Sequence, residues 1–537
     1  MRILRPLALI VAAPLLLPSW GQAEPPKVSS FFPGGGQIGA SVRVEAKGAF
    51  EPWPVQIQVD RPGICFAPEE EAGVFTVSIA EEATPGVAWV RLYNEEGAAT
   101  LRPFLIGTLP EVVEEEPNNA DGQAQAVDPR GVVVNGRLHR SGEVDSFAVE
   151  LESGQTLVAA LEANDRLGSP MDGKLQVVSP EGFVVDHADD SPLLDPSLAF
   201  TAPTSGRYVV RAFAFPAQPD SSIRYSGSDD YVYRLTLTTG GYVDLAHPSV
   251  VGQDEQTEVD AVGWNDPAEP LRVVVGPERT AVAWHPDLAG FAELTVSDLP
   301  VLRVSDIDEE HPATLPSLIC GQLAGDGQAD RFPVRAEAGS SVQLRVEARA
   351  IGSPMDVVIK VVDSSGEELA EMDDLRRQLD PELTVKVPDD GTLHVHVRDL
   401  HRRGGSRFVY RVEAREPAPE VALTVEADQF VLAPDRDKPL DIEVKIDRDR
   451  EYKTPLTVTI EGLPEGVTAE PVVSEAEGDS SKEVTLKVTA SDSAGAWSGP
   501  IRIVGAVEGG EEPEPATAER VGGSRTETLW LTVRPAG

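Results

Sequence analysis

The chain has 537 residues, of which 41% are hydrophobic, 89 are acidic and 46 are basic, so its formal net charge is −43. A surface this acidic repels the phosphates of nucleic acids and of anionic membranes, and we exclude both as partners. The length and the ordinary apolar content suffice for several hydrophobic cores, so a multidomain protein is expected.

Residues 1–23 have the pattern of a secretory signal peptide. Arg2 and Arg5 precede an apolar stretch over residues 6–17, and Gly-Gln-Ala at 21–23 supplies small residues for cleavage. The stretch contains prolines and is shorter than the ~20 residues of a membrane-spanning helix, which disfavours a membrane anchor. We therefore expect an exported protein that is periplasmic, cell-surface or extracellular, with no membrane span after removal of the signal.

Residues 24–110 predict a first small β-sandwich. Runs with a two-residue hydrophobic period, such as residues 40–46, 55–59 and 74–79, are separated by turn residues. The phrase Pro-Gly-Gly-Gly-Gln at residues 33–37, followed by a strand, resembles the immunoglobulin-like, plexin and transcription factor (IPT/TIG) class of small β-sandwiches. This resemblance implies an Ig-like module.

The five-residue sequence Gly-Ser-Pro-Met-Asp occurs twice, at residues 168–172 and 352–356. Other residues around the two copies also match at a nearly constant offset, which indicates an internal duplication. Both copies alternate short apolar runs with turns, which predicts two antiparallel β-sandwiches, at residues 111–240 and 304–415. Other residues that match at an offset of 184 or 185 are Asp145 and Phe147 with Asp330 and Phe332, Gly154 with Gly339, Leu194-Asp195-Pro196 with Leu379-Asp380-Pro381, and Gly206 with Gly391.

Four phrases of the first copy occur in the order known from one bacterial family. They are Glu-Glu-Pro-Asn-Asn at 115–119, Asp145-x-Phe147, Gly-Ser-Pro-Met-Asp at 168–172, and Tyr-x-Tyr-Arg-Leu at 231–235. This order resembles the bacterial pre-peptidase C-terminal (PPC) domain, a jelly-roll-like β-sandwich appended to secreted peptidases and to other exported proteins. The second copy departs from the pattern at its start, where Glu-Glu-His-Pro at 309–312 replaces Glu-Glu-Pro-Asn-Asn.

Two further modules complete the chain. Residues 241–303 have the pattern of a reduced Ig-like module, and residues 416–537 that of a C-terminal Ig-like domain, because Gly-Leu-Pro-Glu-Gly-Val-Thr at 462–468 resembles a turn of bacterial Ig-like domains. The Glu-, Gly- and Pro-rich segment 508–525 is expected to be a mobile loop. The sequence thus predicts an all-β, elongated multidomain chain of tandem jelly-roll-like and Ig-like β-sandwiches.

Oxygen-bearing side chains gather at the entry to the first PPC-like unit. Glu114, Glu116 and Asn118 alternate along an extended strip, so their oxygens point to one side, and Asp145 could complete a cage. Ca²⁺ accepts mixed sets of about six to eight carboxylate and amide oxygens. In PPC domains that bind collagen, acidic and Asn residues of this linker hold calcium, and the resemblance implies Ca²⁺ at these four residues. An acidic linker with a Pro-Asn-Asn turn and no ion explains the same pattern.

No catalytic residue is identified in the sequence. It contains no Gly-x-Ser-x-Gly, His-Glu-x-x-His, phosphate loop or dinucleotide fingerprint. The aspartate pairs at 189–190 and 373–374 and the histidines His394 and His396 are interpreted as turn and strand residues. Cys65 and Cys320 lie in different predicted modules and are expected to be free thiols, with one long-range disulfide left open.

We therefore expect a non-enzymatic protein with a binding or structural role at the bacterial envelope or exterior. Its ligand would be a protein or a polysaccharide, recognised through sandwich loops or edge strands. The alternative is an accessory or targeting partner of a secreted peptidase, since PPC-like units accompany such enzymes.

Overall fold

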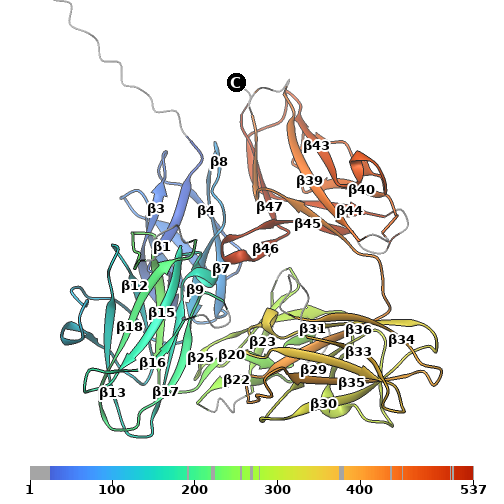
Figure 1. Ribbon diagram of the computed structural model, residues 1–537. Coiled ribbons are helices and arrows are strands. Elements are labelled where there is room, and N and C mark those ends of the chain that lie inside the picture. Colours follow the sequence, from blue (N-terminus) through green and yellow to red (C-terminus); the bar gives the residue numbers. More distant parts are fainter. Residues whose placement is uncertain are drawn as a thin grey trace, which may run out of the picture.

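The computed structural model describes residues 24–189, 193–218, 224–253, 257–265, 270–276, 278–373, 380–433, 435, 438–449, 452–507, 510 and 513–535. This part of the chain is built from β-strands packed as sandwiches, which confirms the predicted fold class (Figure 1). The α-helix described there, α1 (Asn164–Leu167), is a single turn. Within the same residues, no helix is long and apolar enough to cross a membrane. The expected signal peptide lies outside the described residues.

The N-terminal sandwich has two four-stranded sheets that enclose an aromatic core. Phe31, Phe66, Phe75 and Phe104 are buried between the sheets, and neighbouring rings meet at tilted or edge-on angles. The alternating sequence places these rings on inward faces. The first sheet has the order β1 (Lys27–Phe32), β3 (Ser41–Ala49), β6 (Val74–Ile79), β5 (Ile64–Pro68) and the second the order β2 (Gly35–Gln37), β9 (Arg102–Gly107), β7 (Gly86–Asn94), β4 (Gln56–Val59), with β8 (Gly97–Ala98) beside β7.

Two five-stranded sheets form the first duplicated unit, and each contributes an apolar face to its core. One sheet has the order β10 (Glu111–Val113), β12 (Val132–Arg137), β19 (Val232–Thr238), β14 (Thr156–Glu162), β17 (Ser197–Thr201). The other has the order β11 (Gln125–Ala126), β13 (Asp145–Leu151), β18 (Gly206–Pro216), β15 (Met171–Val178), β16 (Val184–Ala188).

The second duplicated unit repeats this topology strand by strand, which confirms the internal repeat. In both units the first strand of each sheet runs parallel to its neighbour and the remaining ladders are antiparallel. Its sheets have the orders β27 (Val301–Arg303), β29 (Ser317–Gln322), β36 (Val409–Arg415), β31 (Ser341–Glu347), β34 (Glu382–Lys386) and β28 (Ala313–Thr314), β30 (Ala329–Arg335), β35 (Thr392–Asp399), β32 (Val357–Val362), β33 (Glu368–Met372).

The residues shared by the two copies form one turn-capping device. Asp195 accepts hydrogen bonds from the backbone N–H groups of residues 163–166, at the start of α1. Asp380 does the same for residues 348–350, at the start of the 3₁₀ turn η3 (Arg349–Ile351). A carboxylate suits these otherwise unpaired N–H groups, and the glycine that ends each turn is left-handed. The repeated Leu-Asp-Pro and Gly-Ser-Pro-Met-Asp sequences are therefore structural.

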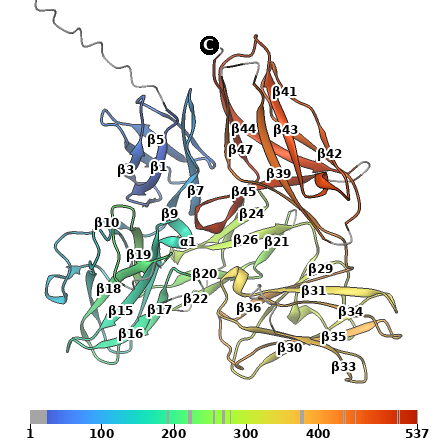
Figure 2. The same ribbon diagram turned by 45° about the horizontal axis from the view of Figure 1, so that its top comes forward.

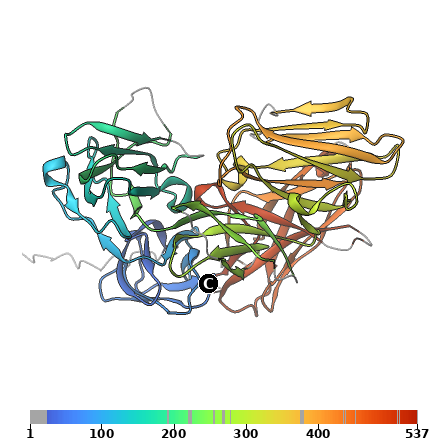
Figure 3. The same cartoon turned by 90° about the horizontal axis from the view of Figure 1, so that it is seen from below.

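A smaller sandwich lies between the two duplicated units (Figure 3). Its strands pair like those of the N-terminal sandwich. A proline follows the first strand in both, Pro33 after β1 and Pro248 after β20, and the next strand, β2 or β21, pairs in parallel with the last long strand of its module, β9 or β26. Among the residues described there, no strands match β5 and β6. Its sheets have the orders β22 (Asp260–Trp264), β20 (Tyr242–His247), β25 (Ala289–Gly290) and β21 (Val250–Gly252), β26 (Ala292–Ser297), β24 (Thr280–Trp284), β23 (Arg272–Val275).

The C-terminal domain closes around its own core through one continuous strand network. Part of the segment that we expected to be a mobile loop forms β45, in which Ala516 and Ala518 are buried, so that expectation is wrong for residues 514–519. The strands are β37 (Val421–Val425), β38 (Gln429–Leu432), β39 (Leu440–Arg448), β40 (Leu456–Glu461), β41 (Val467–Ala469), β42 (Val472–Ser474), β43 (Glu483–Ala490), β44 (Trp497–Ala506), β45 (Glu514–Glu519), β46 (Arg525–Thr526) and β47 (Leu529–Val533).

The C-terminal domain folds back against the N-terminal sandwich (Figure 2). The Arg91 guanidinium lies 3.0 Å from the Asp428 carboxylate, and both side chains are buried. Beside this pair, the rings of Tyr93 and Trp530 lie 4.9 Å apart, centroid to centroid. The modules thus form a closed arrangement in place of the elongated one expected from the sequence, because a buried ion pair joins residues from opposite ends of the chain. Both cysteines are free.

Candidate metal centre

Three carboxylates meet where the chain enters the first duplicated unit. One oxygen from each of Glu114, Glu116 and Asp145 lies within 4.8 Å of the other two. Glu114 directly follows β10, and Asp145 is the first residue of β13 in the facing sheet. The register of the two sheets therefore brings together residues that are 31 positions apart.

A tyrosine that sequence reasoning did not assign to the site lies between two of these groups. The buried Tyr233 hydroxyl is 2.6 Å from Oδ2 of Asp145 and 3.2 Å from Oε2 of Glu114, and it can donate to either oxygen. Its motif, Tyr-x-Tyr-Arg-Leu, was the available signal. The alternation along β19 places Tyr233 on the inward face, but the sequence does not show which carboxylates it meets.

Burial and mutual repulsion disfavour ionisation of both carboxyl groups. Burial, followed by the negative charge of Glu114, holds the pKa of Asp145 well above its usual range. Burial also raises the pKa of Glu114. Without a nearby cation the pair retains a proton near neutral pH, because two close carboxylates in a dry environment do not both ionise.

Asn118, the fourth predicted ligand, has a fully buried side chain. Neither Oδ1 nor Nδ2 of Asn118 has a hydrogen-bond partner, and Oδ1 of Asp145 is also without one. The Asn118 carbonyl accepts a hydrogen bond of 3.2 Å from the N–H of Ser146, which follows Asp145. An unpaired buried polar atom costs roughly 1–3 kcal/mol. Ca²⁺ is a hard cation that takes both amide and carboxylate oxygens, so the residues present fit it.

Glu116 also holds the local turn. Its Oε2 accepts hydrogen bonds from the backbone N–H of Asn118, at 2.9 Å, and from the side chain of Asn119, at 3.2 Å. Glu116 is exposed, in contrast to the buried Asp145. The turn expected from Pro-Asn-Asn therefore exists together with the carboxylate cluster, and the two interpretations of the sequence describe one structure.

The second duplicated unit retains half of this arrangement. The Tyr410 hydroxyl lies 2.6 Å from Oδ2 of Asp330, matching Tyr233 and Asp145. The ladder of β27 and β29 pairs Arg303 with Cys320, as that of β10 and β12 pairs Val113 with Asn135. The next residue is then Val304 in place of Glu114, so the second copy lacks the neighbouring carboxylate and serves as an internal control.

The other residues considered from the sequence do not assemble into a site. Asp172 pairs with Lys174 at 2.8 Å and Asp356 with Arg349 at 3.2 Å, as structural ion pairs. Asp190 and Asp374 lie outside the described residues. In the described part of the chain, His394 and His396 belong to no group of three metal-ligating side chains, and no serine or cysteine is hydrogen-bonded to an imidazole.

No protein-family model matches this chain, and the search of curated proteins found no match. Several solved structures are distantly similar. They include the periplasmic lysozyme inhibitor PliG of Aeromonas hydrophila (11% identity, 24% of this chain, 95% of that chain, TM-score 0.15). A second is Clostridium perfringens ZmpB, comprising an M60 catalytic domain with two CBM51 domains (11% identity, 75% and 56%, TM-score 0.15).

A third is SGBP-B of the Bacteroides ovatus mixed-linkage glucan utilization locus, in complex with a mixed-linkage heptasaccharide (10% identity, 73% of this chain, 74% of that chain, TM-score 0.15). This chain thus spans little more than half the length of the ZmpB structure that it matches. Similarities this weak carry no argument about function, so the functional conclusion depends on the geometry of this chain alone.

Proposed function

We propose that this chain is an exported, non-enzymatic binding protein that uses Ca²⁺ to hold together the two sheets of its first duplicated unit. The observation that carries the proposal is the buried Asp145 carboxyl beside Glu114. The buried side-chain amide of Asn118 has no hydrogen-bond partner, and the backbone of Asn118 is hydrogen-bonded to Ser146, the neighbour of Asp145. Oxygens of these residues and of Glu116 would hold the ion, which supplies the positive charge that this cluster lacks.

The chain's own residues determine what the ion stabilises. Glu114 and Glu116 follow β10, the edge strand of one sheet of the first duplicated unit, whereas Asp145 begins β13 in the facing sheet. One ion bound by both would tie the edge of the first sheet to the facing sheet and so stabilise this unit.

Calorimetric titration of the mature chain with Ca²⁺ tests this proposal. We expect one site in the wild type, none in Asp145→Asn, and an unchanged site in the matched variant Asp330→Asn, because the second copy has Val304 where the first has Glu114. No heat at about 1 mM ion, which corresponds to roughly −4 kcal/mol, would reject the calcium site. Equal losses in the two variants would reject its location.

The binding role is supported by an exposed apolar edge of the same unit. Phe183, Val184 and Val185 are 69%, 48% and 45% exposed at the start of β16, an edge strand whose one partner among the described strands is β15. The corresponding turn of the second copy, which also follows a left-handed glycine, has Glu367, Glu368 and Leu369. Exposed apolar edge strands are normally avoided unless they pair with another chain.

We infer that β16 receives an extended segment of a protein ligand as an added strand, a recognised mode of peptide binding. Glu181, Asp186 and Asp189 flank the apolar residues, and the net charge is −43, so the segment should combine apolar with basic residues. Fluorescence anisotropy with apolar–basic peptides should show binding that a Phe183→Glu/Val184→Glu variant, carrying the residues of the second copy, loses. Equal binding by this variant, or no binding by the wild type, would reject the edge as the ligand site.

A further inference from the structure

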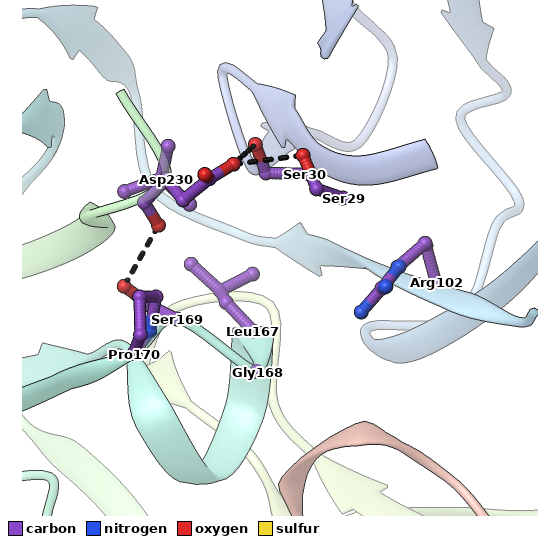
Figure 4. A pocket seen from close by; sticks show the side chains of 9 residues that line it. Ser29, Ser30, Arg102, Leu167, Gly168, Ser169, Pro170 and Asp230 are labelled. Atoms are coloured by element: carbon purple, nitrogen blue, oxygen red, sulfur yellow. Dashed lines mark hydrogen bonds between the residues drawn. The ribbon is translucent and has the colours of Figure 1, made fainter. Parts of the chain in front are cut away.

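A cavity of about 230 Å³ lies between the N-terminal sandwich and the first duplicated unit, away from the carboxylate cluster. Its walls come from β1, β9, the turn after α1 and the segment before β19 (Figure 4). At roughly 30 Å³ per water molecule the cavity has room for about eight waters, or for one small organic molecule.

One wall presents a cation without a carboxylate partner. The Arg102 side chain enters the cavity from the side opposite Asp230 (Figure 4). Its Nε donates to the carbonyl of Val28 at 2.8 Å, and no ion pair involves its terminal nitrogens within the described residues. Burial lowers the pKa of Arg102, and the negative charges of Asp428 and Asp230 oppose this shift only in part. An anionic group in the cavity would compensate this charge.

The opposite wall presents hydrogen-bond acceptors. Ser29 and Ser30 donate their hydroxyl hydrogens to Asp230 Oδ1, at 2.7 and 3.5 Å, and Ser169 donates to the Asp230 carbonyl at 3.2 Å. Asp230 Oδ2 accepts a hydrogen bond from Nζ of Lys47 at 2.9 Å. Because the three hydroxyl hydrogens are used, the lone pairs of their oxygens remain to accept from hydroxyl or ammonium groups of a ligand.

The junction between the smaller sandwich and the second duplicated unit, which we call the second junction, has different side chains at the corresponding positions. The pairing of β1 with β3 and of β20 with β22 places Leu245 where the first junction has Ser30, and Val262 where it has Lys47. By the same correspondence, Ala292 occupies the position of Arg102. Arg407 and Asp244, which form an ion pair, occupy the positions of Asp230 and Ser29. The second junction is closed by an apolar cluster of Leu245, Val262 and Val409 with Ile351 packed against it.

The two junctions therefore share a fold and differ in what fills them. Leu245 Cδ2 lies 3.3 Å from the position that a Cβ on Gly352 would take, which shows that the leucine occupies the space beside that turn. At the first junction, Val521 of the C-terminal domain fills the space beside Gly168, with its Cβ 2.6 Å from the corresponding position. Ser29, Ser30 and Ser169 bring polar groups to the walls of the cavity that remains. Apolar packing throughout is the simpler way to stabilise a junction, so a cavity with polar walls indicates a ligand.

We propose that this cavity binds one small molecule that has a carboxylate at one end and hydroxyl or ammonium donors at the other. The carboxylate would pair with Arg102, and the donors with the oxygens of Ser29, Ser30 and Ser169. Hexuronic acids and α-amino acids share this chemistry. The apolar side chains of Leu167 and Val232 line the remaining wall, where they contact the carbon skeleton.

Calorimetric titration of the mature chain with glucuronate, alanine and glucose tests this proposal. We expect at least one of the two carboxylates to bind with a Kd below about 1 mM and glucose not to bind. Binding of glucuronate alone would identify a sugar acid, and binding of alanine alone an amino acid. No binding of either carboxylate at about 10 mM, or equal binding of glucose, would overturn the proposal.

Two variants locate the site. Ser30→Leu introduces the residue of the second junction, and Arg102→Gln removes the cation while keeping a donor. Both should weaken carboxylate binding at least about tenfold with the melting temperature nearly unchanged. Should Arg102→Gln fail to fold, Ser30→Leu alone decides the matter. Unchanged affinity in folded Ser30→Leu would place the ligand elsewhere and contradict the assignment.

Discussion

The hydroxyl of Tyr233 lies 2.6 Å from Oδ2 of Asp145. The second copy of the repeat has the same pair at the same distance, but without the carboxylate of Glu114 beside it. A shared tyrosine–aspartate hydrogen bond is therefore part of the ancestral fold, and Glu114 is what turns the first copy into a candidate metal centre.

Replacing Asp145 with Asn should have opposite effects on stability with and without calcium. In chelator, Asn keeps an acceptor for Tyr233 and removes repulsion with Glu114, so the variant should be more stable than the wild type by about 1 kcal/mol. At a calcium concentration of about 100 Kd, the wild type gains roughly 2.7 kcal/mol and should become the more stable protein. Urea unfolding with chelator and with calcium measures both differences. A variant that is less stable in both conditions would contradict the account.

Without calcium, the same cluster should make the wild type less stable as the pH rises. The pKa of Asp145 is raised in the folded state, so between the unfolded value near 3.8 and the raised value the folded chain binds more protons than the unfolded chain. Its stability contribution is therefore present at low pH and is lost as the pH rises. Urea unfolding in chelator at pH 5 and pH 8, compared with Asp145→Asn, isolates this slope. A difference between the two proteins that does not change with pH would contradict the shift.

Ionisation of His247 should make the stability of the folded chain change with pH in the opposite direction. Burial lowers the pKa of His247 from 6.5 to about 4, followed by the effect of the nearby positive charge of Arg303, while Asp260 opposes the shift. Between these values the unfolded chain binds the additional proton, so stability is lost as the pH falls from about 6.5 to 4, by at most roughly 3 kcal/mol. His247→Gln should flatten the stability profile in this window. Identical slopes for variant and wild type would refute the prediction.

Closure of the molecule should depend on Asp428. Asp428→Ala leaves the Arg91 guanidinium buried and uncompensated, which costs about 3–5 kcal/mol where the charge stays buried. We expect the C-terminal domain to detach, which small-angle X-ray scattering would record as a larger radius of gyration. The double variant Arg91→Met/Asp428→Leu removes both charges and should remain closed. An open double variant would show that the ion pair itself is needed, contrary to this expectation.

The sequence was sufficient for features that depend on local patterns. Alternation along residues 147–151 predicts an inward face because side chains of a strand alternate by geometry. The repeated Gly-Ser-Pro-Met-Asp correctly indicated an internal duplication, and in the structure Gly168 and Gly352 both have positive φ angles. Among the four predicted ligands, the clustering of Glu114, Glu116 and Asp145 followed from their alternation and from the position of Asp145 at the start of a strand.

Contacts between distant residues could not be predicted in this way. Tyr233 is 88 positions from Asp145, and Arg91 is 337 positions from Asp428, so only the folded chain shows that they meet. The segment around Ala516 and Ala518 is rich in Gly, Glu and Pro, which is typical of loops. Its burial in β45 depends on neighbouring strands that the local composition does not reveal.

Luminescence of Tb³⁺, a substitute for Ca²⁺, tests the calcium centre most directly, because an excited tyrosine transfers energy only to an ion close by. With excitation of tyrosine, we predict sensitised emission from the mature chain that Ca²⁺ displaces. It should be lost in Asp145→Asn, strongly reduced in Tyr233→Phe, and retained in Asp330→Asn and Tyr410→Phe. Emission from the wild type no greater than from Asp145→Asn would contradict a metal centre at these residues.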